Sequence, residues 1–269
     1  MRINGSVIGS VVTSSASSAI GVWDIRNLEI ANRLGLWPNP VDVVTSGLIL
    51  YLDAGNLSSY PGSGTTWTDL SGNGNNLTLT NGPTYTTNNG GSLIFDGTND
   101  YAGLASISSF NAYSISIWFK PTTTVNSTST FKVLFQLRTG SGNDNKYICF
   151  GSATSLLTDE YITFIDATND TRTGITDGGS LSAGSWYNLV FNYESSQYKM
   201  YINNVLKTTS TANGGVPLIT NPNCVYINCY QGALYFADNT LSTCAIYNRT
   251  LSSTELNQNF NAIRTRYGI

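Results

Sequence analysis

Histidine is absent from this chain of 269 residues. It is the usual general base near neutral pH and a common zinc ligand, so its absence excludes Ser-His-Asp and Cys-His catalysis and most zinc sites. Charge is scarce as well, because Asp, Glu, Lys and Arg make up 11% of the chain against the usual ~25%. The surface must therefore be covered by Ser, Thr, Asn and Gly, which favour strands and loops over helices.

The 13 Lys and Arg residues form no cluster, and the net charge is −3. The electrostatic signature of a nucleic-acid-binding protein is therefore missing. No stretch approaches the roughly 20 apolar residues of a membrane span, which predicts no membrane insertion. The first ten residues carry one charge and an apolar run broken by Ser and Gly. Because this makes a poor signal peptide, we expect a protein made in a cytoplasm without a secretion signal.

Cysteine is rare, and none of the four residues forms a Cys-x-x-Cys pair: Cys149, Cys224, Cys229 and Cys244. Without histidine, a zinc site would need all four thiolates. Two interpretations stay open. The cysteines are either buried free thiols that act as small hydrophobic side chains, or they form disulfides, for which three full pairings exist.

What the chain does contain is strand-like sequence. Residues 113–119 alternate cleanly, with Tyr, Ile, Ile and Phe on one face. Further strands are expected at 48–52, 92–95, 131–137, 147–150, 161–165, 186–193, 197–202, 205–207, 225–230 and 243–247. Asn203 and Asn204 suit a tight hairpin turn, and Ser252 with Glu255 forms a capping box for a short helix. More than ten strands between turn signals predict an all-β sandwich or barrel.

The first 46 residues differ from the rest. Residues 1–20 are rich in Ser, Val, Gly and Ala, and residues 39–46 have the composition of a linker. Between them the sequence predicts a short helical or extended anchor with five apolar side chains: Trp23, Ile25, Leu28, Leu34 and Trp37. A helix this short is marginal in water and needs a surface. It either packs back onto the main domain or docks onto an assembly partner.

A series of sequence markers runs from residue 47 to the C-terminus. They include Gly-Leu-Ile-Leu-Tyr-Leu-Asp-Ala at 47–54, Leu-Ile-Phe-Asp-Gly-Thr-Asn-Asp-Tyr at 93–101, Ser-Ile-Trp-Phe at 116–119, Trp-Tyr-Asn-Leu-Val at 186–190 and Ala-Ile-Tyr-Asn-Arg-Thr-Leu at 245–251. In this order they resemble the laminin-G-like jelly-roll domains of the concanavalin A-like lectin/glucanase superfamily. The resemblance implies an antiparallel jelly-roll β-sandwich over residues 47–269, preceded by an anchor and linker at 1–46. It carries little information on function, because the fold hosts lectins, enzymes and interaction modules.

A second resemblance covers residues 21–38, from Gly-Val-Trp-Asp-Ile-Arg to Gly-Leu-Trp-Pro. This segment is similar to short segments near the start of bacteriophage tail and head-surface proteins. The similarity implies a virion protein that is a homo-oligomer or present in many copies. Its N-terminal segment would bind other virion proteins, and its jelly roll would be exposed as head decoration, head fibre or tail fibre.

The superfamily includes glucanases, which place their catalytic carboxylates on one strand face as Glu-x-Asp-x-x-Glu or a close variant. Retaining hydrolysis needs two carboxyl groups about 5 Å apart. None of the four glutamates lies in such a pattern: Glu29, Glu160, Glu194 and Glu255. Asp159 and Glu160 are adjacent and would point to opposite faces of a strand. We therefore expect that the protein is not an enzyme.

Two kinds of binding site remain as hypotheses. Calcium prefers oxygen ligands, and four such residues lie in the family markers, although they would equally serve to cap turns: Asp53, Asp96, Asn99 and Asp100. Carbohydrates stack on aromatic rings. Trp118 and Trp186 lie in strand markers and are expected in the core. Candidate glycan-binding rings in or near loops are Tyr60, Trp67, Tyr85 and Tyr101.

The sequence thus favours a structural protein on a phage virion surface whose jelly roll adheres to cell-surface glycans. The alternative is a cellular or secreted carbohydrate-binding module with no virion role. A convincing signal peptide would have favoured this alternative.

Overall fold

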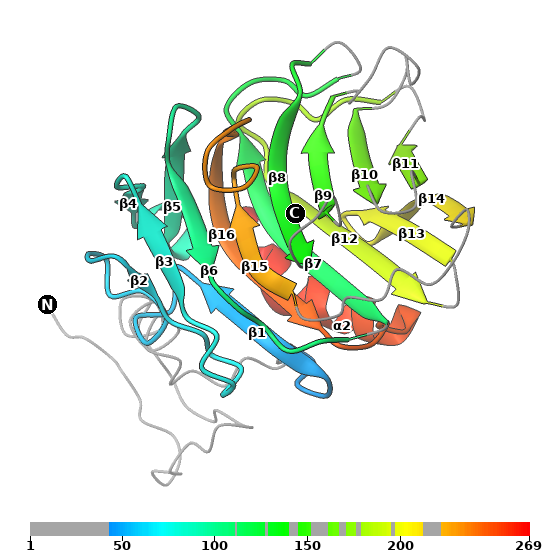
Figure 1. Ribbon diagram of the computed structural model, residues 1–269, viewed down its shortest axis with the longest axis horizontal. Coiled ribbons are helices and arrows are strands. Elements are labelled where there is room, and N and C mark those ends of the chain that lie inside the picture. Colours follow the sequence, from blue (N-terminus) through cyan, green and yellow to red (C-terminus); the bar gives the residue numbers. More distant parts are fainter. Residues whose placement is uncertain are drawn as a thin grey trace, which may run out of the picture.

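The computed structural model describes residues 43–110, 112–126, 129–139, 145–151, 161–166, 171–175, 179–194, 197–211 and 222–269. The predicted anchor and its five apolar residues lie outside these ranges: Trp23, Ile25, Leu28, Leu34 and Trp37. The described strands form two antiparallel sheets of eight strands that pack face to face (Figure 1). This confirms the predicted all-β jelly-roll sandwich.

The first sheet has the strand order β14-β13-β12-β7-β16-β5-β4, with β1 beside β16. Its strands are β1 (Leu48–Asp53), β4 (Thr84–Thr86), β5 (Ser92–Asp96), β7 (Tyr113–Pro121), β12 (Tyr187–Glu194), β13 (Gln197–Ile202), β14 (Val205–Thr211) and β16 (Asp238–Tyr247). The second sheet has the order β11-β10-β9-β8-β15-β6-β3-β2. Its strands are β2 (Thr66–Trp67), β3 (Leu77–Thr80), β6 (Tyr101–Leu104), β8 (Lys132–Thr139), β9 (Asn145–Phe150), β10 (Ile162–Asp166), β11 (Thr171–Ile175) and β15 (Pro222–Ile227).

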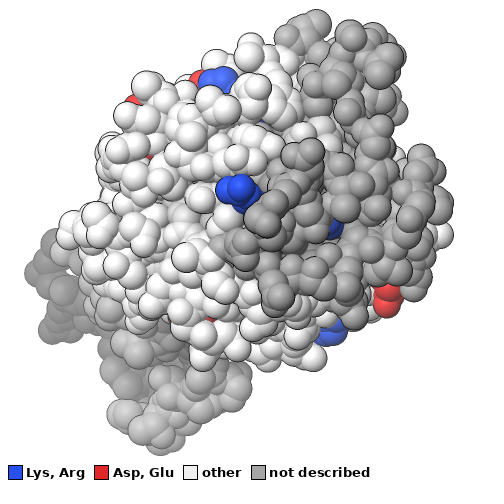
Figure 2. Space-filling model, viewed as in Figure 1, with Lys and Arg blue, Asp and Glu red and all other residues white. Residues whose placement is uncertain are grey.

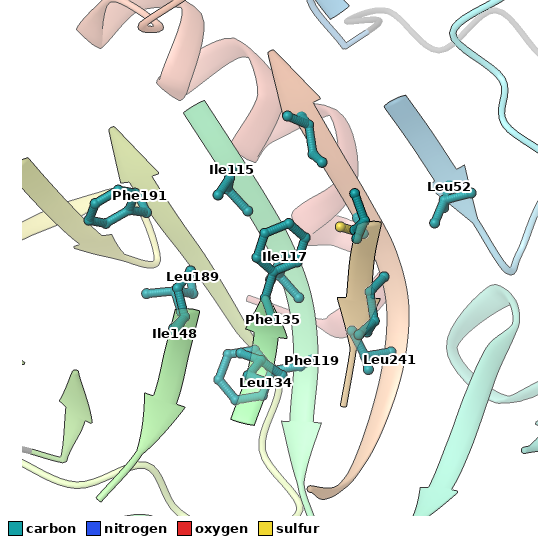
Figure 3. Close-up of a cluster of buried hydrophobic side chains, with 14 of the residues drawn as sticks. Leu52, Ile115, Ile117, Phe119, Leu134, Phe135, Ile148, Leu189, Phe191 and Leu241 are labelled. Atoms are coloured by element: carbon teal, nitrogen blue, oxygen red, sulfur yellow. The ribbon is translucent and has the colours of Figure 1, made fainter. Parts of the chain in front are cut away.

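The main core lies between the two sheets. Alternate residues of β7 and β12 point inward and meet side chains of β8 and β9 (Figure 3). The rings of Phe164 in the second sheet and Phe191 in the first stack with their centroids 4.0 Å apart. Fully burying one such side chain stabilises the fold by roughly 1.5–3 kcal/mol. These contacts fix the distance between the sheets.

The first sheet is buried on its outer face as well. Trp118, on the outer side of β7, stacks on Phe260 and Tyr267 with centroid distances of 5.5 and 4.7 Å. Both rings belong to the C-terminal segment, which forms α2 (Ser253–Ile263) and η2 (Arg264–Tyr267). Trp186 packs on Tyr267 at 4.3 Å. The prediction that both tryptophans are buried is confirmed, but they lie under the C-terminal segment rather than between the sheets.

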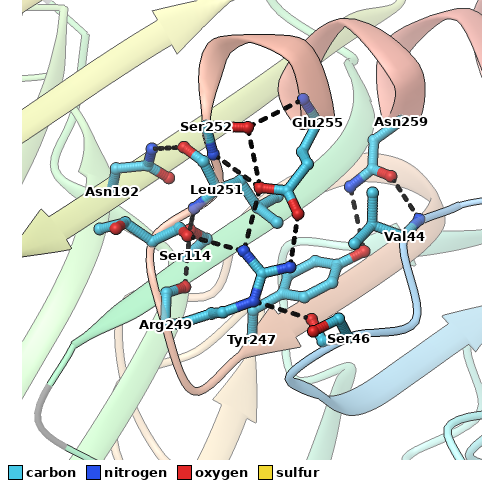
Figure 4. A network of polar contacts seen from close by, with 11 residues as sticks. Val44, Ser46, Ser114, Asn192, Tyr247, Arg249, Leu251, Ser252, Glu255 and Asn259 are labelled. Carbon is cyan, nitrogen blue, oxygen red and sulfur yellow. Dashed lines mark hydrogen bonds and ion pairs between the residues drawn. The ribbon is translucent and has the colours of Figure 1, made fainter.

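A polar network fixes the start of α2 (Figure 4). The Ser252 hydroxyl accepts a hydrogen bond from the Glu255 amide at 3.3 Å, and the Ser252 amide donates to the Glu255 carboxylate at 2.9 Å. This is the predicted capping box. Arg249 donates to both oxygens of Glu255, at 2.6 and 3.0 Å. The same carboxylate therefore caps the helix and joins it to the end of β16.

The described end of the predicted linker is held by the same network. Asn259 of α2 accepts a hydrogen bond from the Val44 amide at 2.7 Å and donates to the Tyr247 hydroxyl at 3.0 Å. Arg249 donates to the Ser46 carbonyl at 3.1 Å. Val44 is buried among apolar side chains of the first sheet and of α2. Residues 43–46 thus pack on the sandwich.

Other local predictions can also be compared with the structure. Asn203 and Asn204 join β13 to β14 with φ values of 49° and 64°, as expected of a tight hairpin turn. The four cysteines are buried and free, which decides between the two interpretations left open above. Among the described residues, no helix is long and apolar enough to cross a membrane.

The Arg249–Glu255 pair generates a prediction on pH. The Arg249 guanidinium and then the Ser252 amide lower the pKa of Glu255 to about 2, below its unfolded value of ~4.3. The pair therefore stabilises the fold above pH ~4 and loses this contribution as the pH falls toward 2. Both side chains are partly exposed, 32% and 26%, so solvent screening reduces the effect to about 1 kcal/mol.

We expect Glu255→Gln to keep the capping box, because Gln serves at this position, and to lose the charge pair. Chemical denaturation should show a loss of about 1 kcal/mol at pH 7, shrinking to nothing near pH 2. Ser252→Ala, which removes the cap but keeps the pair, is the control and should leave the pH dependence in place. An equal loss for Glu255→Gln at both pH values would contradict the electrostatic explanation.

Candidate functional site

Two of the four predicted glycan-binding rings belong to the core. Trp67 is fully buried and Tyr60 is 3% exposed, because β2 and the loop before it fold over the edge of the sandwich. The Tyr60 hydroxyl donates to the Gly64 carbonyl at 3.0 Å, and its ring packs on Tyr85 at 5.5 Å. The Tyr85 hydroxyl is itself buried. The structure therefore removes Trp67 and Tyr60 as stacking surfaces and turns Tyr85 toward the core.

Tyr101 has a different environment. It lies on β6 and points away from the core, on the outer side of the second sheet. Its ring packs edge-on against Tyr226 of β15 at 6.0 Å and lies 6.4 Å from Phe236. It is the predicted ring that the structure places, partly exposed, on the outer face of a sheet.

More aromatic rings lie on the same side of this sheet. Phe131 contacts Tyr147 at 6.0 Å and Tyr235 at 4.8 Å. Tyr230 contacts Tyr147 at 5.6 Å and Tyr235 at 6.0 Å. We call the whole set the aromatic face: Tyr101, Phe131, Tyr147, Tyr226, Tyr230, Tyr235 and Phe236.

Strand register explains why these side chains share a face. Residues directly opposite each other on neighbouring strands point to the same side of a sheet. Tyr226 pairs with Gly103 of β6 on one side and with Gln136 of β8 on the other, and Gln136 pairs with Tyr147 of β9. Tyr226, Gln136 and Tyr147 thus lie side by side on three neighbouring strands, and all three side chains point to the outer face.

The loop between β15 and β16 crosses this row. The Gln231 amide donates to the buried Gln136 side chain at 2.7 Å, which fixes the loop to the sheet. Gly232 lies against Tyr101 and Tyr226, since a Cβ atom there would be 3.4 Å from either side chain. The loop leaves Leu234 and Tyr235 at its outer edge, 54% and 49% exposed.

Tyr235 adopts a strained backbone conformation, with φ of 54°. Positive φ is a genuine outlier for a bulky residue, and strain of this kind costs roughly 1–3 kcal/mol and clusters at ligand sites. The contacts of its ring with Phe131 and Tyr230 hold it there. Tyr235 is therefore a half-exposed aromatic ring held in a strained backbone conformation.

The surface seen from this side carries few charges. In Figure 2, which shares the view of Figure 1, most of the described surface is uncharged. Burial raises the pKa of the Tyr226 hydroxyl to about 12, and this hydroxyl is hydrogen-bonded to the Cys224 thiol. Arg138 follows Gln136 on β8, and its buried Nε atom has no hydrogen-bond partner. The face thus combines apolar rings with a few polar donors.

The predicted calcium ligands are not all together. Asp53 accepts two hydrogen bonds from Arg266, at 2.8 and 3.1 Å, so its charge is already compensated. Asp53 and Asp96 pair with Thr243 and Asp238 of β16, which are five residues and roughly 16 Å apart. Asp53 is therefore too far from Asp96 for all four predicted ligands to hold one calcium ion, and the hypothesis of a single site is wrong in this respect.

The other three residues form a self-contained turn. Asp96 accepts hydrogen bonds from the amides of Thr98 and Asn99 at 2.8 and 3.3 Å, and the first of these lowers its pKa. Asp100 accepts from the Asp96 amide at 3.3 Å, while burial raises its pKa. No group of three or more acidic or cysteine side chains within the described ranges has the geometry of a metal site.

Comparison with known proteins agrees with this architecture. The profile of the concanavalin A-like lectin/glucanases superfamily (Laminin_G_3) matches residues 96–257. The chain belongs to this family. The matched segment contains the whole aromatic face, from Tyr101 to Phe236. No curated protein sequence matches the chain.

Several solved structures share the fold. Domain 4 of AbnA, a GH43 extracellular arabinanase from Geobacillus stearothermophilus solved in complex with arabinotriose, is 18% identical, with a TM-score of 0.60 over 81% of this chain and 98% of that domain. A structure of botulinum neurotoxin type C, whose cell entry depends on two ganglioside molecules, is 15% identical, with a TM-score of 0.59 over 82% of this chain and 52% of that chain. The type G receptor binding domain is 14% identical, with a TM-score of 0.55 over 80% and 51%. At these identities the similarity shows only a common fold. The present chain covers about half of the length of each of the two neurotoxin chains.

Sequence reasoning identified one member of the aromatic face and missed the other six. Phe131, Tyr147, Tyr226 and Tyr230 were placed in strands, but strand alternation alone does not tell which of two apolar faces is covered. Tyr235 and Phe236 lie in a loop that carries little hydrophobic pattern. The clustering of Tyr226, Tyr230 and Tyr235 within ten residues was the signal that could have found them.

The turn around Asp96 generates a second prediction. Because its carboxylate is satisfied by backbone amides, we expect the same melting temperature in chelator and in millimolar calcium. Asp96→Ala should lower the melting temperature equally in both, and Asp96→Asn, which keeps one side-chain oxygen as acceptor, should lower it less. A melting temperature that rises with calcium in the natural chain and not in Asp96→Asn would establish a calcium site.

Proposed function

We propose that this chain is a non-enzymatic glycan-binding protein and that the aromatic face holds the glycan. The observation that carries the proposal is the set of seven aromatic rings on the outer side of the second sheet, with Tyr235 half exposed. Exposed apolar patches with polar groups at their border mark binding sites. Sugar rings have an apolar C–H face and hydroxyl edges, which suits flat aromatic rings next to groups such as Gln231.

The structural neighbours support a carbohydrate ligand. One was solved with arabinotriose, and another concerns ganglioside-dependent cell entry. These ligands belong to those proteins, and the glycan of this chain is to be found by screening. The scarcity of charge on the visible face favours a neutral or weakly charged glycan.

Engagement of the carboxylates supports the non-enzymatic part of the proposal. Glu255 is bound by Arg249 and by the start of α2, and Glu194 accepts a hydrogen bond from Thr250. Asp53 is paired with Arg266. Retaining and inverting hydrolysis both need two carboxyl groups across a sugar-binding cleft. The described carboxylates serve instead as caps and ion-pair partners.

We further propose that the protein is displayed on a bacteriophage particle, with residues 1–46 attached to other virion proteins and the jelly roll facing outward. This part rests on the resemblance of residues 21–38 and on the apolar side chains of that segment. Many copies on one particle would convert weak glycan binding into firm adhesion through avidity. The alternative is a cellular or secreted carbohydrate-binding module.

Glycan binding is tested on an array of bacterial and host glycans, followed by titration calorimetry with the best ligand. We expect Tyr235→Asn to weaken binding about two- to tenfold, since one aromatic contact contributes about 0.5–1.5 kcal/mol. Asn tolerates positive φ, so this variant should fold at least as well as the natural chain. Undiminished affinity of Tyr235→Asn would move the ligand away from the aromatic face.

A matched pair of leucines controls for general surface effects. Leu234, in the loop between β15 and β16, is 54% exposed, and Leu206, on β14 of the first sheet, is 50% exposed. We expect Leu234→Ala to weaken binding and Leu206→Ala to leave it unchanged. Equal effects of the two substitutions would contradict a localised site.

The virion location is tested by mixing the purified protein with phage particles that lack it and sedimenting the particles. We expect full-length protein to co-sediment and protein lacking residues 1–38 to remain in the supernatant. Five large apolar side chains in the deleted segment can each contribute roughly 1.5–3 kcal/mol before ordering costs. Co-sedimentation of both forms would show that the sandwich itself makes the attachment.

A further inference from the structure

A pocket of about 410 Å³ opens at one end of the sandwich, where both sheets contribute a strand end. Pro121 ends β7 and Asp238 begins β16 in the first sheet. Lys132 begins β8 and Phe150 ends β9 in the second. The other lining residues are Thr123, Thr124, Val125, Asn126, Ser129 and Thr130. Pockets for small ligands usually span about 300–1,000 Å³, so this one suits one or two sugar-sized rings and not a long chain.

The pocket contains one ion pair. The Lys132 ammonium lies 3.5 Å from the Asp238 carboxylate, and the two side chains are 30% and 27% exposed. The pair places a cluster of donors beside a cluster of acceptors while adding no net charge. Two neighbouring hydroxyl groups of a sugar match this arrangement, because one can donate to the carboxylate while the other accepts from the ammonium.

The rest of the lining is of two kinds. Val125 and Phe150 provide apolar surface, while Thr123 and Asn126 provide hydroxyl and amide groups. The backbone of this wall is fixed, since Val125 and Leu181 exchange hydrogen bonds of 2.9 and 2.8 Å. The lining thus combines small apolar areas with hydroxyl and amide groups, which suits the C–H and hydroxyl groups of a sugar ring.

The pocket adjoins the aromatic face through two short segments. Phe131 of the face directly precedes Lys132 of the pocket. Phe236 of the face is followed after one residue by Asp238, as the chain passes from the second sheet to the first. The residues of the aromatic face and those of the pocket are therefore neighbours in sequence at two places.

We propose that this pocket is a subsite for the terminal ring of the glycan and that it selects a neutral, hydroxyl-rich sugar through Lys132 and Asp238. The proposal rests on the proposed glycan-binding function and adds the class of sugar and the end of the chain that is recognised. An acidic sugar is disfavoured, because the Lys132 ammonium is already compensated by Asp238.

Two neighbouring threonines allow a matched test. Thr123 lines the pocket and Thr122 does not, although both are exposed. Thr123→Tyr should fill the pocket, and Thr122→Tyr is its control. Asp238→Asn, which keeps the size of the side chain but removes the charge, tests the ion pair independently. Melting curves confirm that each variant is folded.

The probes are arabinose, galactose, glucose, mannose and the acidic sugar galacturonate, each followed by ligand-observed NMR at millimolar concentration. We expect at least one neutral sugar to bind the natural chain and Thr122→Tyr, to fail to bind Thr123→Tyr, and to bind Asp238→Asn at least tenfold more weakly. Tyr235→Asn should leave this monosaccharide binding unchanged. Binding that survives both pocket variants, preference for galacturonate, or no neutral sugar bound by the natural chain would overturn the proposal.

The same variants separate this proposal from the function proposed above. If longer glycans bind in a Tyr235-dependent way while no monosaccharide enters the pocket, the aromatic face stands and the subsite is wrong. If monosaccharides bind in a Thr123-dependent way while Tyr235→Asn changes nothing for longer glycans, the subsite stands and the aromatic face is wrong.

Discussion

The arrangement depends on the first sheet being buried on both of its faces. In β7 every residue except Lys120 is buried, and in β16 every residue except Asp238. Such strands cannot face water, so the sandwich needs a third layer on one side only. The C-terminal segment supplies it, with Phe260 and Tyr267 stacked on Trp118. Two ion pairs hold the C-terminal segment on the sheet: Arg249–Glu255 at the start of the helix and Asp53–Arg266 after its end. Asp53, which belongs to a family marker, thus helps to hold this segment in place.

The outer side of the second sheet is covered in a different way. Val133, Cys149 and Ile165 are buried there, with aromatic side chains such as Phe131, Tyr147 and Tyr230 packed against them. The loop after β15 crosses only the middle of this sheet, held by Gln136, and leaves aromatic rings on either side of it. The low charge of the chain has a consequence here, because solubility must come from hydroxyl and amide groups that also bind sugars well. The central strands of the first sheet are thus buried on both faces, while the second sheet carries the aromatic face.

The sequence predicted the fold in detail wherever a strand is apolar. The alternation at residues 113–119 and the capping box at Ser252 correspond to β7 and α2. It missed short polar strands such as β3 and β4, since Thr-rich runs of three or four residues resemble loops until a neighbouring strand pairs with them. The residues of the candidate site were harder to predict than the strands. The position of Trp67 in a loop suggested exposure, but the edge of the sandwich buries it completely. No local pattern tells which face of the second sheet carries the aromatic rings. Those outcomes depend on contacts between residues far apart in the chain, which periodicity does not encode.

The strained loop explains how the aromatic face is kept in position. Asn228, Gln231 and Tyr235 all have positive φ, a conformation that Asn tolerates and Tyr does not. The loop holds this shape because Asn228 and Asn239 exchange two buried hydrogen bonds, of 3.1 and 2.9 Å, where the chain returns to the first sheet. The twice-buried sheet therefore stabilises a conformation that the loop alone would not adopt. The rings of the aromatic face are therefore held in position by contacts within the protein itself.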